Sequence, residues 1–447
     1  MRDVQRALTT REVYTAWWPL AASWLLMALE GPLQTIVVAR LAAPEIHLAA
    51  FGSLVLPISM FIEAPIIMLL AASTALCVDL PAYLRIRRFM HRLSAGLTAI
   101  HVLVAVTPLY DLVVVGALGA PAETVEPARI GLILMIPWTW SIAYRRFQQG
   151  VLIRYGHSMT VGIGTVVRLS ANAVVLVVGF ALRGPGTLVA SAAIAAGVLS
   201  EAAYAGLRVR PVLRTQVPAD AGGPPLSGRD FFRFYVPLSL TSLVLLGVRP
   251  ILTAAVGRMP DPLESLAVLP VVNGLVFLFR SVGAAYSEVV IATLGRPGST
   301  RAVARFAGAL ALATTAGLVV ITVTPLSSIW FGWISGLSGP LAALAKSGLW
   351  LTLTLPAAAA LQSYFQGFLV YSRKTRSLTE AVLIYLAATV ALLAAGAAWA
   401  GAPGVSIALA SISVGEWLRT GWFAWRSRSA RQSLAERDRI ATATAKA

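Results

Sequence analysis

Long runs of hydrophobic residues alternate with short polar or charged segments along the whole chain. About 20 apolar residues in a helix are enough to cross the ~30 Å hydrocarbon core of a bilayer, so each run predicts a transmembrane helix. The predicted segments are residues 15–39, 47–75, 93–117, 129–152, 158–182, 186–207, 232–257, 265–294, 303–325, 341–370, 378–399 and 404–425. They predict an all-α polytopic membrane protein with about twelve transmembrane helices.

The composition and the distribution of charge agree with this architecture. The chain of 447 residues is 57% hydrophobic and 12% charged, whereas soluble domains average about 25% charged residues. Basic residues gather in loops and termini on one side of the predicted membrane, 25 of them against four on the other side. The positive-inside rule therefore predicts a multi-pass protein of the cell membrane with both termini cytoplasmic. This bias explains the net charge of +17 without a nucleic-acid partner.

The two halves of the chain repeat one another. The segment “REVYTAWWPL”, which begins at Arg11, aligns without gaps with “RDFFRFYVPL”, which begins at Arg229. Further along, “QGVLI” matches “QGFLV”, and “GVLSE” ending at Glu201 loosely matches “SISVGE” ending at Glu416. Six spans return a chain to its starting side, so the repeats are expected to share one orientation. A pseudo-twofold axis along the membrane normal and a substrate site between the repeats near the midplane follow from that symmetry.

The repeat also predicts the domain organisation. A stretch rich in Pro and Gly joins the two halves and reads as a flexible linker. The predicted parts are an N-terminal six-helix bundle over residues 1–210, a cytoplasmic linker over 211–228, a C-terminal six-helix bundle over 229–428 and a cytoplasmic tail over 429–447. The loops between spans are too short to hold a globular catalytic domain, which favours a transporter over an enzyme.

Several segments resemble a known superfamily of membrane exporters. The first span of each repeat resembles a span of the multidrug/oligosaccharidyl-lipid/polysaccharide (MOP) exporters. These segments are “WWPLAASWLLMALEGPLQTIVVAR”, which resembles the first span of those exporters, and “FYVPLSLTSLVLLGVRPILTAAVGR”, which resembles the seventh. Within that superfamily, “VRPILTAAVGR” is similar to a span of the progressive ankylosis (ANK) family. The segments “QQGVLIRYGH”, “FQGFLVYSRK” and “GVSIALASISVGEW” fit the same family. The resemblance covers about residues 11–428.

This resemblance implies a fold and a class of substrate. It implies a MATE-like arrangement of two parallel six-helix repeats around a V-shaped central cavity, which moves by alternating access. ANK relatives are associated with export of small polyvalent anions such as citrate, nucleotides and pyrophosphate. The resemblance therefore implies a secondary transporter with a small-molecule anion as its substrate.

Ionisable residues within the spans are the candidate substrate site, because exposing them to lipid is costly. The candidates are Glu30, Glu63, Arg145, Arg146, Arg168, Arg249 and Arg280. Across the repeat, Glu30 aligns beside Arg249, and Glu63 aligns beside Arg280. We expect one of these acids to pair with one of these arginines in the empty state, so that an anionic substrate competes for the arginine. The alternative is that buried ion pairs only fix helix packing.

Matched prolines suggest where the helices bend. Pro32 aligns with Pro250, and proline removes a backbone donor and kinks a helix. Gly31, Pro32 and Pro250 are therefore candidate hinges. The four histidines have no metal-ligand spacing, and no phosphate loop or nucleophile motif is present, so we expect no metal and no cofactor. Coupling to protons or to sodium and the oligomeric state stay open.

The sequence leaves other functions open. A multidrug efflux antiporter and a flippase for lipid-linked precursors belong to the same superfamily, and the arginines also suit a lipid-linked pyrophosphate. From other classes, a membrane-embedded enzyme would need polar residues clustered at one membrane face, and none stand out. A non-transporting scaffold would be a sealed bundle without a central cavity.

Overall fold

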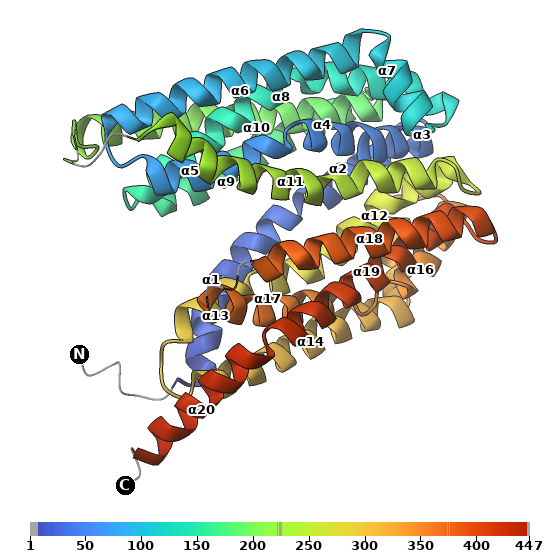
Figure 1. Cartoon of the computed structure of the whole chain (residues 1–447). Helices are drawn as coiled ribbons and strands as arrows, with labels where there is room; N and C mark the ends of the chain where they lie inside the picture. Colours follow the sequence, from blue (N-terminus) through green and yellow to red (C-terminus); the bar gives the residue numbers. More distant parts are fainter. Residues whose placement is uncertain (1–7, 221, 223–225, 373, 375, 445–447) are drawn as a thin grey trace. The chain divides into compact units, whose positions relative to one another are not determined.

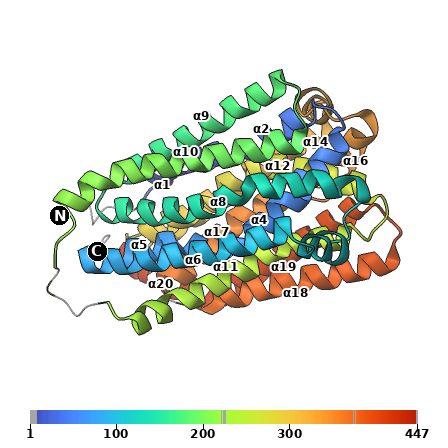
Figure 2. The ribbon, with the colours of Figure 1, turned by 90° about the horizontal axis from the view of Figure 1, so that it is seen from above.

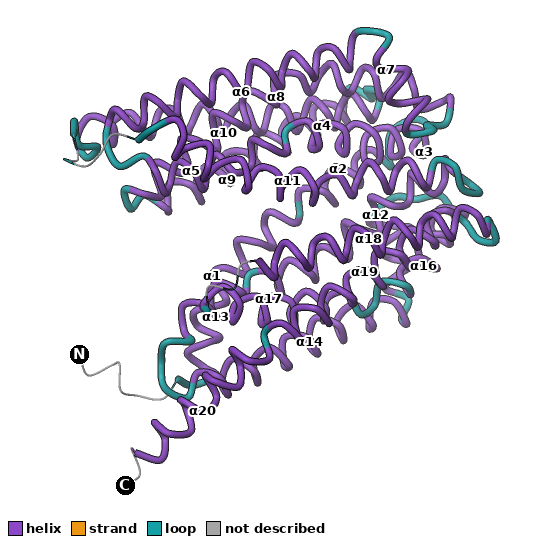
Figure 3. The backbone as a smooth tube through the Cα atoms, viewed as in Figure 1, coloured by secondary structure: helices purple, strands orange, loops and turns teal. Residues whose placement is uncertain are grey.

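The computed structural model describes residues 8–220, 222, 226–372, 374 and 376–444. These residues form helices and connecting loops, with no strand among them (Figure 3). The chain divides into two compact units, unit 1 (Met1–Pro32 with Val271–Ala447) and unit 2 (Leu33–Pro270). The predicted all-α membrane fold is confirmed, and each unit is described on its own below.

Unit 2 contains the helices of the first repeat that follow α1, together with the first helix of the second repeat (Figure 1). Its helices are α3 (Pro44–Leu48), η2 (Ala49–Val55), α4 (Leu56–Ile62), η3 (Ala64–Met68), α5 (Leu69–Leu76), α6 (Leu80–Val106), α7 (Leu109–Asp111), η4 (Leu112–Ala117), α8 (Ala122–Arg154), α9 (Ser158–Ala181), α10 (Gly186–Thr215) and α11 (Gly228–Val256). Helices α8, α9 and α10 run side by side in both views of the ribbon (Figure 2).

Unit 1 contains the first helix of the chain and most of the second repeat. Its helices are α1 (Thr10–Ala28), α13 (Tyr286–Thr293), α14 (Ser299–Val323), α15 (Leu326–Ser328), η5 (Ile329–Ile334), α16 (Gly339–Trp350), α17 (Leu355–Tyr371), α18 (Arg376–Trp399), α19 (Gly404–Arg426) and α20 (Arg428–Thr444). The boundaries between the units fall inside α2 (Glu30–Val38) and α12 (Pro262–Ala284).

All twelve predicted spans correspond to helical regions. Among the described residues, nine helices are long and apolar enough to cross a membrane, and the pair α16–α17, bent by 42°, makes a tenth. The two remaining predicted spans are α8, with 33 residues, and α19, with 23 residues. These two helices carry Arg145 and Arg146 in α8 and Glu416 and Arg419 in α19. The polar residues that lower their apolarity are the ones that build the candidate site.

The backbone repeats along with the sequence. The short helix α7 and the π-helical turn η4 that follows it recur at the equivalent place in the second repeat as α15 and η5. Gly119 and its repeat equivalent Gly336 both have positive φ angles, of 63° and 70°. Ala43 and its equivalent Asp261 share the left-handed conformation at 47° and 52°, which is uncommon for residues other than glycine. A duplicated six-helix unit explains these recurrences.

The first helix of each repeat packs in the unit that holds the rest of the other repeat. In unit 1, the Trp17 indole of α1 donates a hydrogen bond of 3.1 Å to the Val282 carbonyl of α12. In unit 2, the Tyr235 hydroxyl of α11 donates one of 2.5 Å to the Pro65 carbonyl of η3. The predicted bundles, residues 1–210 and 229–428, divide the chain by its sequence repeat. The compact units divide it by contacts, and they differ from the repeats by the exchange of α1 and α11. The predicted division into two six-helix bundles therefore stays a prediction.

The segments predicted as linker and tail include helical residues. Helix α10 continues to Thr215, so the start of the predicted linker is helical, and α11 begins at Gly228 with Ser227 as its N-cap. Part of the linker, residues 221 and 223–225, lies outside the described residues. Most of the predicted tail forms α20, which packs on α14, α17 and α19.

Candidate functional site

The candidate charges fall in both units. Glu30 and Arg280 belong to unit 1, whereas Glu63, Arg249 and the three arginines Arg145, Arg146 and Arg168 belong to unit 2. Within each unit, arginines surround a glutamate that was not among the predicted site residues. We call these two groups the Glu201 network and the Glu416 network.

The Glu201 network joins three helices of unit 2. Glu201 of α10 is fully buried. Its Oε2 lies 2.5 Å from Nη1 of Arg145 on α8 and 3.2 Å from Nε of Arg168 on α9. Its Oε1 accepts a hydrogen bond of 2.9 Å from Nε2 of Gln149. Two guanidinium groups and an amide therefore compensate one buried carboxylate, which would otherwise cost several kcal/mol to desolvate.

Two further charged side chains of unit 2, Glu63 and Arg146, each have a buried polar atom without a hydrogen bond among the described residues. Glu63, the C-cap of α4, is 2% exposed, and its Oε2 has no hydrogen-bond partner among the described residues. Arg145 and Arg146 act electrostatically on this carboxylate. The buried Nε of Arg146 also lacks a hydrogen-bond partner among the described residues. Since buried polar groups are nearly always hydrogen-bonded, these two atoms are expected to need a further polar partner, such as water or a ligand.

The Glu416 network is built in the same way in unit 1. Glu416 of α19 is 4% exposed, and its Oε1 lies 2.5 Å from Nη2 of Arg280 on α12. Its Oε2 lies 3.5 Å from Nη1 of Arg419 and accepts a hydrogen bond of 2.9 Å from Nε2 of Gln362 on α17. The same amide donates to Oγ1 of Thr420 at 3.0 Å. Arg280 and Arg419 keep 25% and 19% of their side chains exposed, so neither guanidinium group is fully enclosed by protein.

The two networks are related by the repeat. Glu201 and Glu416 both lie in the last long helix of their repeat, and Gln362 occupies the position of the second repeat that is equivalent to Arg145. The loose match of “GVLSE” with “SISVGE” was the sequence signal for this pair of glutamates. It did not identify them as the centres of the networks, because only the packed structure shows which helices approach the carboxylates.

Within unit 1, the described partner of Arg280 is Glu416, because α12 and α19 both belong to this unit and bring the two side chains together. The expected pairing of Glu30 or Glu63 with Arg249 or Arg280 stays a prediction. Glu30 is half-buried at the start of α2, and Arg249 is exposed on α11. These two residues lie in different units, so a pairing between them stays a prediction.

The candidate hinges differ in their local structure. The helical run breaks at Leu29, between α1 and α2, and the chain passes from unit 1 to unit 2 directly after Pro32. Pro250, in contrast, lies inside the continuous helix α11. The role of Gly31, Pro32 and Pro250 as hinges stays a prediction.

The described residues contain no group of three or more His, Cys, Asp or Glu side chains that could hold a metal ion. Among the described residues, each of the two clusters of buried charges instead holds one more guanidinium than carboxylate. Three arginines accompany Glu201 and Glu63 in unit 2, and two arginines accompany Glu416 in unit 1. Planar guanidinium groups can bind carboxylate and phosphate oxygens in bidentate fashion.

Comparisons with solved structures agree on one fold. An inward-facing multidrug resistance MATE family transporter of the MOP superfamily is 16% identical, with a TM-score of 0.66 over 93% of this chain and 98% of its own. A MOP superfamily transporter from Pyrococcus furiosus, whose binding pocket is described as having reverse polarity, is 17% identical with a TM-score of 0.59, over 97% and 98%. The lipid II flippase MurJ, in an inward closed conformation, is 13% identical with a TM-score of 0.69, over 94% and 90%.

The sequence matches no protein-family model and no curated protein. None of these three structural relatives is described as an ANK transporter, so the resemblance to ANK stays a prediction. The resemblance to the MOP superfamily is confirmed at the level of the fold. The chain has the all-helical fold of the MATE-like transporters of the MOP superfamily.

Proposed function

We propose that this chain is a secondary transporter of the cell membrane that exports small organic or phosphate-bearing anions by alternating access. The fold supports the transporter part of the proposal, because its solved relatives are a MATE transporter, a MOP transporter and a flippase. The conformations of two of them, inward-facing and inward closed, are states of such a cycle.

The observation that carries the choice of substrate is the excess of buried arginine. In unit 2, Arg145 and Arg168 share Glu201, while Arg146 keeps an Nε without a hydrogen-bond partner among the described residues. An uncompensated positive charge inside a membrane protein is expensive. A bound anion would neutralise it and accept from the free donor, whereas a cationic drug would add to the repulsion.

The ANK resemblance supports citrate, nucleotides and pyrophosphate as candidate substrates. All three carry several negative charges, which suits a site that holds more guanidinium groups than carboxylates. Glu63, whose Oε2 lacks a hydrogen bond among the described residues, is the candidate carboxylate for coupling to protons or sodium. Both termini are proposed to lie in the cytoplasm, as the positive-inside distribution predicts.

A flippase for lipid-linked precursors is the second candidate. The likeness to MurJ supports the fold of such a protein, and a lipid-linked pyrophosphate also suits arginines. Multidrug efflux is less well supported, because the described networks have net positive charge. The reversed pocket polarity described for the Pyrococcus furiosus transporter indicates that this fold accommodates different charge patterns.

Reconstitution into liposomes tests the proposal. Purified protein is reconstituted, a proton or sodium gradient is imposed, and uptake of citrate, ADP, pyrophosphate and a cationic dye is measured. Uptake of at least one anion, absent from liposomes without protein, is the expected result. Uptake of the dye alone would overturn the anion assignment, and movement of a lipid-linked pyrophosphate with no anion uptake would favour the flippase.

A further inference from the structure

A strongly basic pocket opens on unit 1, away from the Glu416 network. It lies where the turn between α17 and α18 meets the junction of α19 and α20. Its volume is about 590 Å³, and its cationic lining residues are Lys374, Arg376, Arg426 and Arg428. Trp425 forms an apolar wall.

Most of this positive charge is uncompensated. Glu380 is the one carboxylate paired with the described lining residues, at 3.3 Å from Nε of Arg376 and 3.2 Å from Nε of Arg426. Lys374 donates a hydrogen bond of 2.7 Å to the Ser429 hydroxyl, which holds its ammonium group at the pocket without neutralising it. Four cations thus share one carboxylate. Such a pocket attracts anions, and guanidinium groups match the geometry of phosphate oxygens.

A second pocket extends this basic surface along α20. It shares Arg428 and Gln432 with the first pocket and is also lined by Arg301, Arg431 and Tyr364. The guanidinium of Arg431 stacks over the Phe365 ring at 4.9 Å and donates to the Ala424 carbonyl. Those contacts fix Arg431, whereas Arg428 and Arg301 are exposed at the pocket. The second pocket has a volume of about 430 Å³. Because the two pockets share lining residues, we treat them as one basic groove.

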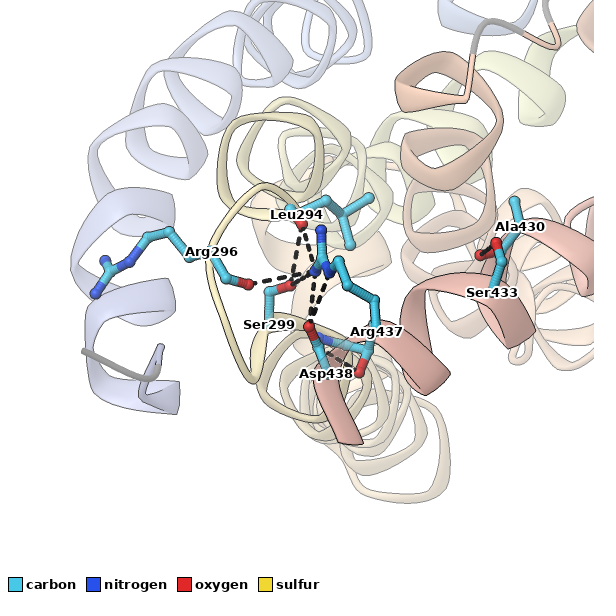
Figure 4. Close-up of polar contacts among 8 residues, drawn as sticks. Leu294, Arg296, Ser299, Ala430, Ser433, Arg437 and Asp438 are labelled. Carbon is cyan, nitrogen blue, oxygen red and sulfur yellow. Dashed lines mark hydrogen bonds and ion pairs between the residues drawn. The ribbon is translucent and has the colours of Figure 1, made fainter. Parts of the chain in front are cut away.

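The far end of α20 is anchored, which holds the groove in shape. The Arg437 guanidinium donates to the carbonyls of Leu294 and Arg296 after α13 (Figure 4). Asp438 accepts hydrogen bonds of 2.9 Å and 2.7 Å from the backbone N–H and the hydroxyl of Thr300 at the start of α14. The same helix that carries Arg428 and Ser429 is therefore held against the loop between α13 and α14.

The groove lies at the end of the membrane spans. Trp425, which is 60% exposed, and Tyr371, at the end of α17, are aromatic residues of the kind that mark the membrane–water interface. The turn between α17 and α18 and the tail belong to the side that the positive-inside distribution predicts to be cytoplasmic. Anionic lipids of the cytoplasmic leaflet present phosphate groups at this level, and basic pockets between helices bind such headgroups.

We propose that this groove is a binding site for a phosphate group, presented by the headgroup of an anionic phospholipid. The phosphate would contact Lys374, Arg428 and Arg376, and its glycerol and acyl chains would pass Trp425 toward the bilayer. The site is separate from the proposed transport site, because none of its lining residues belongs to the Glu201 or Glu416 networks. The proposed lipid site therefore does not depend on the identity of the transported substrate.

Native mass spectrometry of the purified full-length protein tests the site. Phosphatidylglycerol and phosphatidylcholine are titrated against the wild type, against the double variant Lys374→Gln/Arg428→Gln, and against the matched control Arg208→Gln/Arg210→Gln. The control removes two exposed arginines from α10 in the other unit. The double variant loses two of the proposed cationic contacts to the bound phosphate. At about 1 kcal/mol, or about fivefold, for each contact, it should bind phosphatidylglycerol roughly 25-fold more weakly. The control should bind as the wild type does.

A second arm separates lipid from soluble phosphate. The melting temperature of the wild type is measured with glycerol 3-phosphate and with inorganic phosphate. Retention of phosphatidylglycerol over phosphatidylcholine supports the lipid source. Stabilisation by glycerol 3-phosphate without lipid retention rejects the lipid and keeps the phosphate site. Equal binding of phosphatidylglycerol by the double variant and the wild type would overturn the site.

Discussion

At the scale of the residue, the proposed function depends on two buried carboxylates, Glu201 and Glu416. Each forms ion pairs with two arginines and accepts a hydrogen bond from a glutamine amide. A buried ion pair contributes little net stability, yet removing one partner leaves an uncompensated charge. Breaking either network is therefore costly, and under the proposed function an anion would compete with the glutamates for the arginines.

Neutralising Glu201 should destabilise the protein strongly. Glu201→Gln leaves Arg145 and Arg168 buried without their shared carboxylate, and the expected loss is about 3–5 kcal/mol of unfolding free energy. The melting temperature of purified protein in detergent measures it. Glu126→Gln, at an exposed position of α8, is the control and should melt as the wild type does. A Glu201→Gln variant with wild-type melting would contradict the described network.

The sequence predicted which arginines are intramembrane but not their partners. Arg145, Arg168 and Arg280 could be recognised because charges are rare inside apolar runs. Their carboxylate partners come from α10 and α19, which are distant in the sequence. Arg280 contacts Glu416, a partner that the repeat alignment did not suggest, since alignment shows equivalence between positions and says nothing about contact.

At the scale of the element, the repeated Gln-Gly motif is explained by helix packing. A Cβ atom at Gly150 of α8 would collide with the Ser73 hydroxyl and the Leu70 carbonyl of α5. At the equivalent Gly367 of α17, a Cβ atom would lie 2.5 Å from Cγ1 of Val290 on α13. Glycine at these positions lets the fourth and tenth spans approach their neighbours closely.

Adding one methyl group at the Gly150 contact should therefore weaken the fold. Gly150→Ala overpacks the α5–α8 contact, at an expected net cost of about 1–3 kcal/mol. Gly162→Ala is the matched control, because a Cβ atom there meets nothing within 4 Å, and alanine is the better helix former by about 1 kcal/mol. Thermal melting of both variants is the measurement. Equal melting of the two variants would show that the close approach is absent.

Helix positions could be predicted well, and helix partners could not. Length and apolarity are local properties, so the twelve predicted spans match helical regions even for α8 and α19 with their buried charges. The exchange of α1 and α11 between the compact units depends on contacts such as the one from Trp17 to Val282. Such contacts leave no periodic signal in the sequence.

At the scale of the whole molecule, the distribution of basic residues predicts the orientation. The sole cysteine, Cys77, is 1% exposed, so we expect it to react little with a maleimide. A cysteine introduced at an exposed position can therefore be labelled selectively. Asp220→Cys lies on the predicted cytoplasmic side, and Ser338→Cys lies on the opposite side; both positions are exposed. In intact cells, an impermeant maleimide should label Ser338→Cys and should leave Asp220→Cys unlabelled until the cells are opened. The reverse pattern would invert the proposed topology.

The claim of anion transport is tested most directly by the initial rate of anion uptake in the Arg146→Gln variant. The buried Nε of Arg146 has no hydrogen-bond partner among the described residues, and Arg146 acts electrostatically on the buried Glu63. The melting temperature of the variant is therefore measured alongside uptake to show that it folds. Uptake of the anion that the wild type transports should fall at least tenfold, the equivalent of about 1.4 kcal/mol for one lost charge-assisted contact. The control variant Arg210→Gln should transport normally. A well-folded Arg146→Gln variant with wild-type uptake would contradict the proposed role of the buried arginines.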